Sequence, residues 1–256
     1  MKIIQEMFAD QLSVCAFDTR ADMGECAGTE AAEAIRRVIA EKGVANVMFA
    51  AAPSQNETLE TLVNAEGIDW SKVNAFHMDE YVGLDASHPA GFRNFLKRAI
   101  FDKKNFRSVN LLNGNAEDPF EEAMRYERIL RDNPLDICLC GVGENGHIAF
   151  NDPPVADFRD PRLVKVVELE DVCRLQQVHD GCFQHLGQVP THALTVTIPG
   201  MTGAKAMYCT VPAATKAQAV YHMLRDAISE KCPATILRKH PNAKLYLDRD
   251  SAQLIL

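Results

Sequence analysis

The chain has 256 residues, of which 47% are hydrophobic and 24% charged, and this length is enough to bury one large core. Its formal net charge of −8 argues against nucleic-acid binding, which usually requires a basic face. The start of the chain lacks the apolar region of a signal peptide, and the longest apolar stretch, residues 44–53, is too short to span a bilayer. We therefore expect a cytoplasmic protein with reduced cysteines that binds neither nucleic acid nor membrane.

Short apolar runs alternate with helical patterns along the chain, and no repeat or linker divides it. Strands are predicted, in chain order, at residues 47–52, 73–78, 135–140, 163–169, 193–198, 206–211 and 244–247. Helices are predicted at residues 31–42, 91–101, 119–131 and 216–228. This alternation predicts a single α/β domain over residues 1–256, with a mostly parallel sheet covered by helices on both faces. The crowded strands between 163 and 211 predict some antiparallel pairing.

Polar side chains follow the first two predicted strands, at the positions where open parallel sheets bind ligands. The first strand leads into Ser54, Gln55 and Asn56 at the start of a helix, whose free N–H groups suit an anion. A plain helix cap explains the same residues equally well. The second strand leads into the adjacent carboxylates Asp79 and Glu80, for which two solvated turn residues are the simpler interpretation.

The third predicted strand leads into a loop, residues 141–154, that contains three glycines, His147 and Asp152. Glycine allows the backbone to approach a ligand closely. A histidine in such a loop can exchange protons near neutral pH, and a nearby carboxylate would fix its tautomer. A structural hydrogen-bonding role is the alternative for a lone histidine, but the neighbouring glycines favour a functional one.

Two other kinds of site are rejected. Residues 141–146 fit a dinucleotide-binding pattern with Glu168 about 20 residues further on, but the prolines at 153–154 prevent the long helix that this pattern opens. Four side chains could be drawn together as a zinc site: Cys173, His179, Cys182 and His185. Their spacings do not form two tight ligand pairs. We therefore expect neither NAD nor a metal.

Three segments carry a resemblance to a known family: residues 76–84, 110–115 and 141–153, with weaker matches at 189–196 and at Lys216. Together they resemble the glucosamine-6-phosphate deaminase/isomerase family over most of the chain. The resemblance implies a Rossmann-like α/β fold and a reaction without metal or cofactor. In that reaction the ring of glucosamine 6-phosphate opens, a proton moves between C1 and C2, and ammonia leaves to give fructose 6-phosphate.

The resemblance also implies roles for individual residues. It assigns the transfer of the carbon-bound proton to Asp79 and the ring-opening shuttle to His147, with Asp152 as its supporting carboxylate. Asn145 takes the place of a third ring-opening residue. The residues expected to bind the substrate are Ser54, Gln55, Asn56, Glu80, Gly143, Gly146 and Lys216. Lys216 matches the family's phosphate-contacting lysine.

The chain departs from the family's pattern at several positions. Many relatives carry Asp where this chain has Asn145, and Asp152 is one methylene shorter than the usual Glu, so its reach to His147 requires a backbone adjustment. The first loop lacks the family's Thr/Ser-Gly-Gly-type phosphate cradle, and it carries Glu57, whose charge is unfavourable if it points toward a phosphate. The family's phosphate-binding arginine, expected in the segment that follows residue 170, has no clear counterpart, and Arg174 is the candidate.

We expect a deaminase that converts an amino-sugar 6-phosphate to a ketose 6-phosphate and ammonia. The altered first loop leaves another amino sugar, such as galactosamine 6-phosphate, as an alternative. A 6-phosphogluconolactonase-type hydrolase on the same fold is a further alternative, although it predicts a different pattern after the second strand. A sugar-phosphate sensor ranks last, because the short acidic N-terminal stretch leaves no room for the DNA-binding helix-turn-helix that such regulators normally carry. Relatives include monomers and hexamers, so a homo-oligomer stays open.

Overall fold

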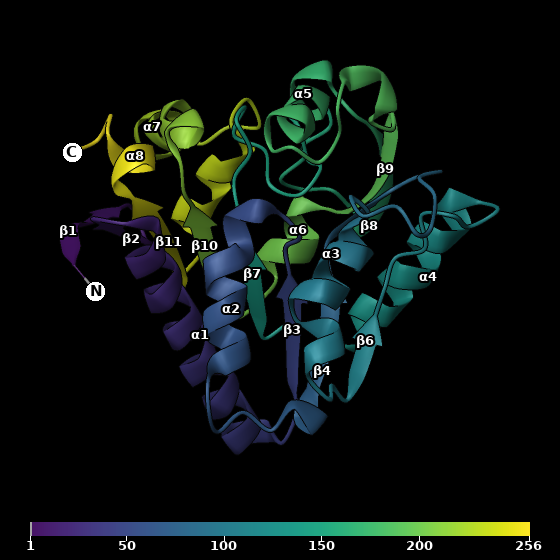
Figure 1. Cartoon of the computed structure of the whole chain (residues 1–256), viewed down its shortest axis with the longest axis horizontal. Helices are drawn as coiled ribbons and strands as arrows, with labels where there is room; N and C mark the ends of the chain where they lie inside the picture. Colours follow the sequence, from purple (N-terminus) through teal and green to yellow (C-terminus); the bar gives the residue numbers. More distant parts are fainter. Residues whose placement is uncertain (1) are drawn as a thin grey trace.

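The structure, a computed structural model, describes residues 2–256. It contains one large sheet (Figure 1). Its eight strands are β1 (Ile3–Ala9), β2 (Leu12–Phe17), β3 (Ala45–Phe49), β4 (Val73–His77), β6 (Ser108–Asn110), β7 (Ile137–Cys140), β10 (Ala206–Val211) and β11 (Ala243–Asp248). Across the sheet they follow the order β1-β2-β11-β10-β7-β3-β4-β6. Among the described residues, β1 and β2 form its antiparallel pair and the other neighbours are parallel. The predicted mostly parallel α/β sheet is confirmed.

A second, smaller sheet begins where β4 ends. It consists of β5 (Asp79–Tyr81), β8 (Val164–Glu168) and β9 (His192–Val196), with β9 between the other two and antiparallel to both. The antiparallel pairing expected between residues 163 and 211 is therefore confirmed. Because β4 ends at His77 and β5 begins at Asp79, the chain passes directly from one sheet to the other. This crossing fixes the backbone at Asp79.

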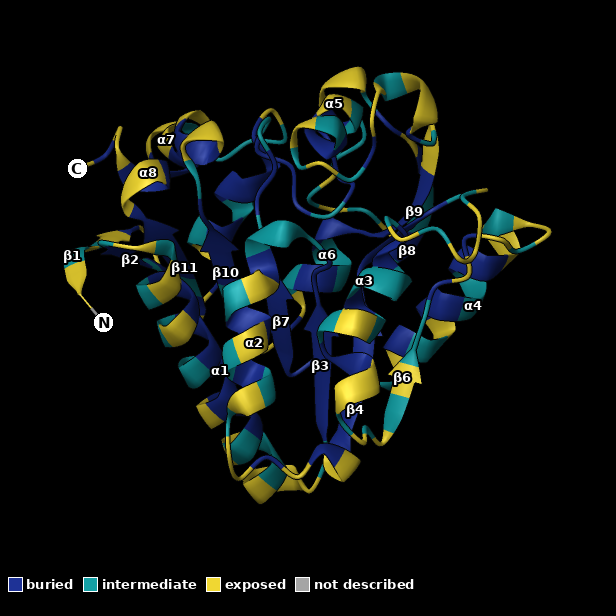
Figure 2. Ribbon diagram, in the orientation of Figure 1, coloured by how far each residue is buried: buried dark blue, intermediate teal, exposed yellow. Residues whose placement is uncertain are grey.

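Helices cover both faces of the large sheet, as predicted. The helices of the chain are α1 (Arg20–Lys42), α2 (Asn56–Asn64), α3 (Phe92–Ala99), α4 (Pro119–Asp132), α5 (Asp171–His179), α6 (Ile198–Thr202), α7 (Ala217–Arg225) and α8 (Arg249–Ala252), of which α5 lies beyond the end of the sheet (Figure 1). One apolar core joins α1, α2 and α3 to Val47 and Phe49 of β3, and the other joins α4, α7 and α8 to Met48 of the same strand. Adjacent side chains of a strand point to opposite faces, which places one core on each side. Figure 2 shows the central strands buried and the outer helix surfaces exposed. No helix within residues 2–256 is long and apolar enough to cross a membrane.

The N-terminal region differs from the sequence prediction. The sequence patterns do not predict the hairpin of β1 and β2, and α1 begins at Arg20 rather than at residue 31. Glycine has a low helix propensity, so Gly24 and Gly28 weaken the helical pattern in the first half of α1. Both glycines pack against α2, where a side chain would clash. Thr19 caps this end of the helix by accepting a backbone hydrogen bond.

Candidate active site

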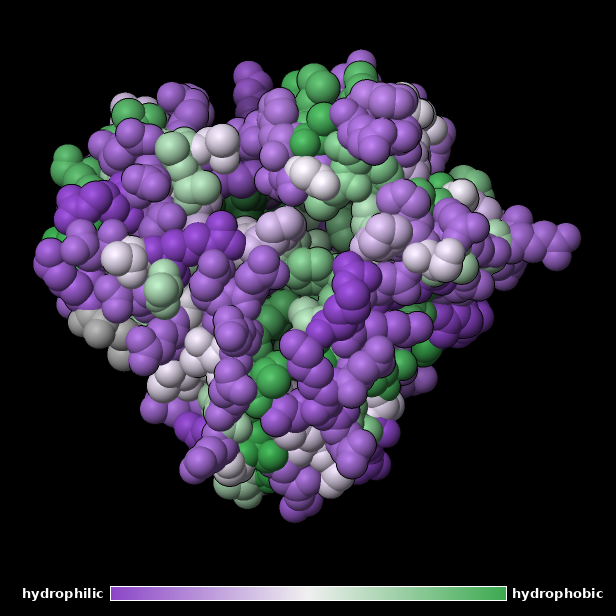
Figure 3. All heavy atoms as spheres, viewed as in Figure 1, coloured by the Kyte–Doolittle hydropathy of each residue, from purple (hydrophilic) through white to green (hydrophobic). Residues whose placement is uncertain are grey.

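A pocket opens beyond the carboxyl ends of β3, β4, β7 and β10, where ligands bind in open parallel sheets. It is an open pocket, and its space of about 760 Å³ includes a part that is open to solvent. Gln176 and Gln177 of α5 and the following Asp180 also line it. Figure 3 shows this face of the molecule hollowed between the parts that carry α5 and α7. The loops that follow the predicted strands therefore meet at one place.

Asp79 lies in this pocket as the first residue of β5. Its side chain is buried, and its Oδ1 has no hydrogen-bond partner among residues 2–256. Burial raises the pKa of Asp79 well above its usual value, and the charge of Glu80 raises it further. A carboxylate in this setting holds its charge poorly in the free protein and is a strong base when ionised.

Glu80 contacts the first residues of the neighbouring helix α3. Its Oε1 accepts hydrogen bonds from the N–H groups of Tyr81 at 3.0 Å and Phe92 at 3.1 Å, and its Oε2 accepts one from Arg93 at 3.0 Å. These contacts place a carboxylate at the N-terminus of α3, where negative charge is favourable. Glu80 therefore ties β5 to α3, and the substrate contact expected from the sequence stays a prediction.

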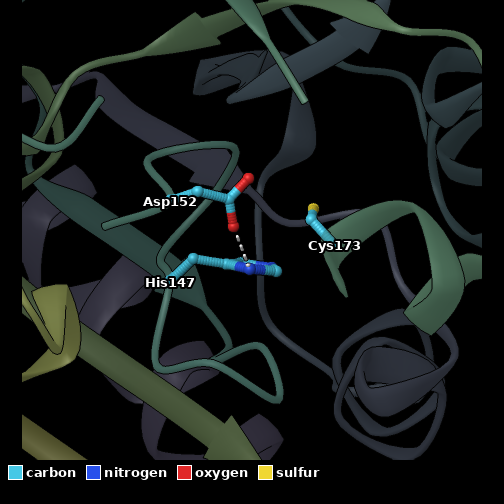
Figure 4. Close-up of side chains that lie close together, drawn as sticks. All are labelled: His147, Asp152 and Cys173. Carbon is cyan, nitrogen blue, oxygen red and sulfur yellow. Dashed lines mark ion pairs between the residues drawn. The ribbon is translucent and has the colours of Figure 1, made fainter. Parts of the chain in front are cut away.

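His147 lines the pocket and belongs to a buried hydrogen-bond network (Figure 4). Its Nδ1 lies 2.9 Å from Oδ1 of Asp152 and 2.8 Å from Oδ1 of Asn145. The Nδ2 group of Asn145 donates to the same Asp152 oxygen at 2.8 Å. Both contacts of Nδ1 are to oxygen acceptors, so Nδ1 carries the proton and Nε2 is the nitrogen that can accept one. The shorter Asp152 side chain therefore reaches His147 after all.

The surroundings of the imidazole ring explain why the loop needs glycine. The ring lies directly over Gly143, where an added Cβ atom would be 2.1 Å from Cε1 of His147. The N–H group of Gly143 also donates to the backbone oxygen of His147 at 2.9 Å. Burial alone raises the pKa of Asp152, but hydrogen bonds from His147 and Asn145 outweigh it, so this pKa lies below its usual value. Asp152 therefore stays ionised and holds the ring in one orientation.

Cys173 of α5 completes a group that could in principle ligate a metal (Figure 4). Donor atoms of His147, Asp152 and Cys173 lie within 4.8 Å of one another. A metal here would have to displace the proton on Nδ1 and both of its hydrogen bonds. Burial raises the pKa of the Cys173 thiol, and the Asp152 charge raises it further, so the thiol stays protonated. The donor set thus suits a hydrogen-bond network better than a metal centre.

The loop after β3 contributes Ser54 to the pocket but uses its neighbours differently. Gln55 is buried, and its Nε2 donates to the backbone oxygens of Cys140 at 3.3 Å and Thr210 at 3.4 Å. It therefore ties the loop to the ends of β7 and β10, although part of it lines the pocket wall. Asn56 is exposed at the start of α2. Ser54 is thus the residue of this loop best placed to contact a ligand.

Lys216 brings a positive charge to the pocket from the turn before α7. Its side chain is buried, and its Nζ has no hydrogen-bond partner within the described residues. Burial lowers the pKa of Lys216, although Asp180 and Glu144 oppose this effect. The turn is held by Ala213, which has a φ of 83° and donates its N–H to Asp248. A buried ammonium without a partner is costly, so this arrangement favours an anionic ligand.

Comparison with known proteins identifies the family of the chain. The sequence profile of a family described as glucosamine-6-phosphate isomerases/6-phosphogluconolactonase matches residues 18–246. The chain belongs to this family. It is 35% identical over 221 residues to a glucosamine-6-phosphate deaminase of Listeria welshimeri, covering 85% of this chain and 92% of the relative. It is 38% identical over 187 residues to a protein of the same name from Bacillus thuringiensis, covering 73% of this chain and 70% of the relative.

Solved structures of the glucosamine-6-phosphate isomerase/6-phosphogluconolactonase family share the fold. One described as a monomeric glucosamine-6-phosphate deaminase matches with a TM-score of 0.85 and 28% identity, covering 94% of this chain and 99% of that one. A 6-phosphogluconolactonase from Shewanella baltica matches with a TM-score of 0.73 and 14% identity, covering 94% of this chain and 99% of that one. The second likeness concerns the fold alone. The expected Rossmann-like fold and family are confirmed.

Two residues considered as ligand contacts from the family's pattern lie elsewhere. Arg174 is committed to the α5 region, because it donates to Asp171 at 2.8 Å and to the backbone oxygens of Leu186 and Val189, each at 3.0 Å. Gly146 has a φ of 83° and packs against Cys232, whose Sγ would lie 2.5 Å from an added Cβ atom. Both residues therefore shape the loops of this family member.

Sequence reasoning missed four charged or amide side chains that line the pocket: Arg20, Gln176, Gln177 and Asp180. None of them lies in a segment that carries the family resemblance. Gln176 accepts a hydrogen bond from the N–H of Glu144 at 2.9 Å, which links α5 to the glycine-rich loop. Arg20 reaches the pocket through packing between α1 and α2, far from it in sequence. Such contacts have no local sequence signal.

Proposed function

We propose that the chain deaminates a 2-amino-2-deoxyhexose 6-phosphate, with glucosamine 6-phosphate as the substrate, to give the ketose 6-phosphate and ammonia. One observation supports this most strongly. Asp79, His147 and Lys216 come from three separate strand ends and line the same pocket. A base for a carbon-bound proton, a proton shuttle and a cation for an anionic group are the parts that this reaction needs. The names of two similar relatives agree.

Ring opening is assigned to His147. With its Nδ1 proton held by Asp152 and Asn145, the neutral imidazole offers Nε2 to the pocket. Nε2 can accept the proton of the anomeric hydroxyl, and the resulting imidazolium can give a proton to the ring oxygen, which opens the pyranose to the aldehyde. The Asp152 carboxylate stabilises the imidazolium between these two steps.

Isomerisation is assigned to Asp79. Its carboxylate removes the proton from C2 of the open-chain substrate and returns it to C1, while the ammonium group gives one proton to O1. The products of this step are a hydroxymethyl group at C1 and an iminium at C2. Water then adds to C2 and ammonium leaves, which yields the ketose. The raised pKa of Asp79 strengthens it as a base toward carbon.

The cysteines support a reducing location. All eight lie within the described residues and carry free thiols, most of them buried. Thiols of this kind persist in the reducing environment of the cytoplasm. We therefore propose that the protein acts there.

A substrate panel tests the assignment. Glucosamine 6-phosphate is expected to give the highest kcat/KM among glucosamine 6-phosphate, galactosamine 6-phosphate and 6-phosphogluconolactone, because the pocket provides a base for a carbon-bound proton. The measurement is ammonia release for the amino sugars and acid release for the lactone. A preference for galactosamine 6-phosphate would change the sugar and keep the chemistry. Lactone hydrolysis without any ammonia release would contradict the proposal.

Replacement of Asp152 by Asn is expected to lower kcat by about 10²- to 10⁴-fold, because the amide no longer stabilises the imidazolium or selects the tautomer of His147. KM should change little, since Asp152 lies behind the imidazole. Asp152→Glu restores a carboxylate and is the matched control, with activity expected within about tenfold of the wild type. The measurement is kcat and KM of the two variants and of the wild type by steady-state kinetics. Equal activities of Asp152→Asn and the wild type would refute the assigned role.

A further inference from the structure

Among the residues that the resemblance assigns to phosphate binding, one lines the pocket and carries a positive charge. This is Lys216, whose Nζ has no partner within residues 2–256. The segment 171–183, where the family's arginine was expected, contributes the carboxylate of Asp180 to the pocket wall instead. A phosphate dianion beside one ammonium and one carboxylate would be poorly neutralised in a buried site. A second group that donates hydrogen bonds to the phosphate is therefore expected for the substrate proposed above.

Arg20 lines the same pocket from the first position of α1. Its Nε donates to Oε1 of Glu57 at 2.7 Å, and its Nη2 donates to the backbone oxygen of Pro53. Its Nη1 makes no hydrogen bond to any described residue. Pro53 and Ser54 line the pocket too, so the guanidinium lies against the loop best placed for an anion. We propose that Arg20, together with Lys216, binds the phosphate group of the substrate. This inference rests on the proposed function.

The negative charge of Glu57 suggests that it would repel a phosphate, but its contact with Arg20 gives it another role. Its Oε1 pairs with Arg20, and the two side chains are 30% and 35% exposed. Because Nε is held by this carboxylate, the planar guanidinium is fixed with its Nη1 side available for a further acceptor. The charges of Glu57 and Arg20 offset each other, so Arg20 contributes hydrogen-bond donors to a phosphate rather than a net positive charge.

The sequence places Arg20 here through the spacing of two glycines. Arg20, Gly24 and Gly28 are four residues apart and lie on one face of α1. An added Cβ atom at Gly24 would be 2.3 Å from Cβ of Glu57, and one at Gly28 would be 2.6 Å from Cβ of Thr61. The close packing brings the first turn of α2 within reach of Arg20. A cation in the first turn of a helix also opposes the helix dipole, a local cost that a ligand contact explains.

Titration calorimetry with inorganic phosphate tests the assignment without any need for turnover. Arg20→Ala is expected to weaken phosphate binding by about 10- to 100-fold, the effect of losing a hydrogen bond between charged groups. Arg36→Ala is the matched control, because Arg36 lies on the same helix and donates to the backbone oxygen of Glu66, away from the pocket. This control is expected to bind phosphate as the wild type does.

A second variant guards against a folding defect. Arg20→Ala also removes the link between α1 and Glu57, so Arg20→Gln is measured beside it, and thermal unfolding checks that both variants fold. For the amino-sugar phosphate, KM is expected to rise by the same factor while kcat stays within about threefold. Phosphate affinity within twofold of the wild type in both folded variants would overturn the proposal, as would a wild type that binds no phosphate at millimolar concentration. If phosphate binding depends on Arg20 but no amino-sugar phosphate is turned over, the proposed function fails and this assignment stands.

Discussion

Asp79→Asn is expected to lower kcat by about 10²- to 10⁴-fold and to make the protein more stable at neutral pH. Activity falls because an amide cannot remove the proton from C2. Stability rises because Asp79 is buried, and its Oδ1 has no partner among the described residues. An unsatisfied buried group costs about 1–3 kcal/mol, and the uncharged amide escapes most of the cost of burying a charge. The carboxylate of Asp79 therefore lowers the free energy of unfolding of the protein.

The gain in stability should depend on pH, with a sign that follows from the pKa of Asp79. Burial raises this pKa in the folded protein above its value in the unfolded chain. The protonated form is therefore favoured by folding, and the contribution of Asp79 to stability is lost as the pH rises through the raised pKa. Asparagine does not titrate. The difference between Asp79→Asn and the wild type should thus be larger at pH 8 than at pH 5.

Urea unfolding of both proteins at the two pH values measures this difference. A matched control is Glu80→Gln, in which the neighbouring carboxylate is removed while Asp79 remains. Because Glu80 accepts hydrogen bonds from three backbone N–H groups, this variant is expected to be less stable than the wild type. A loss of stability in Asp79→Asn at pH 8 would show that the carboxylate has an unrecognised partner.

Gly143→Ala is expected to reduce kcat by about 10²-fold or more, although Gly143 itself provides no side chain. The added Cβ atom would lie 2.1 Å from Cε1 and 2.2 Å from Nε2 of His147, so the imidazole must move. Displacement of a catalytic group by about 1 Å is enough for a loss of this size. Steady-state kinetics give the effect on kcat, and circular dichroism shows whether the fold is kept.

Gly187→Ala is the matched control for this substitution. An added Cβ atom at Gly187 would meet the ring of His185 at 3.3 Å, a contact that a small movement relieves. The control is expected to keep kcat within about twofold of the wild type. Normal activity in Gly143→Ala would mean that the imidazole can work from another position, which would contradict the account of ring opening given above.

The sequence predicts where the proposed catalytic residues lie, because they are found at strand ends. Asp79 and His147 each follow a buried strand, and both lie in the pocket that those strands form. Local patterns are less informative about which way a polar side chain turns. Glu80 and Gln55 are predicted to bind substrate, and the structure gives each a structural role as well, because Glu80 caps α3 and Gln55 ties its loop to the ends of β7 and β10.

The phosphate half of the site depends on contacts between distant segments. Arg20 reaches the pocket because Gly24 allows α1 and α2 to pack closely. In the sequence alone, a glycine argues against a helix at its position. For the same reason the sequence pattern does not predict the first half of α1. The short strands β5 and β6 are three residues each, too short for an alternating pattern to mark them. Tertiary packing, rather than local propensity, decides these features.

The most direct test of the central claim follows both products of one reaction. Purified protein is given glucosamine 6-phosphate, and ammonia and fructose 6-phosphate are measured in the same samples over time, for the wild type and for Asp79→Asn. The account predicts that the wild type forms the two products in equal amounts and that folded Asp79→Asn forms neither at a comparable rate. Undiminished formation of both products by Asp79→Asn, or no product from the folded wild type, would contradict it.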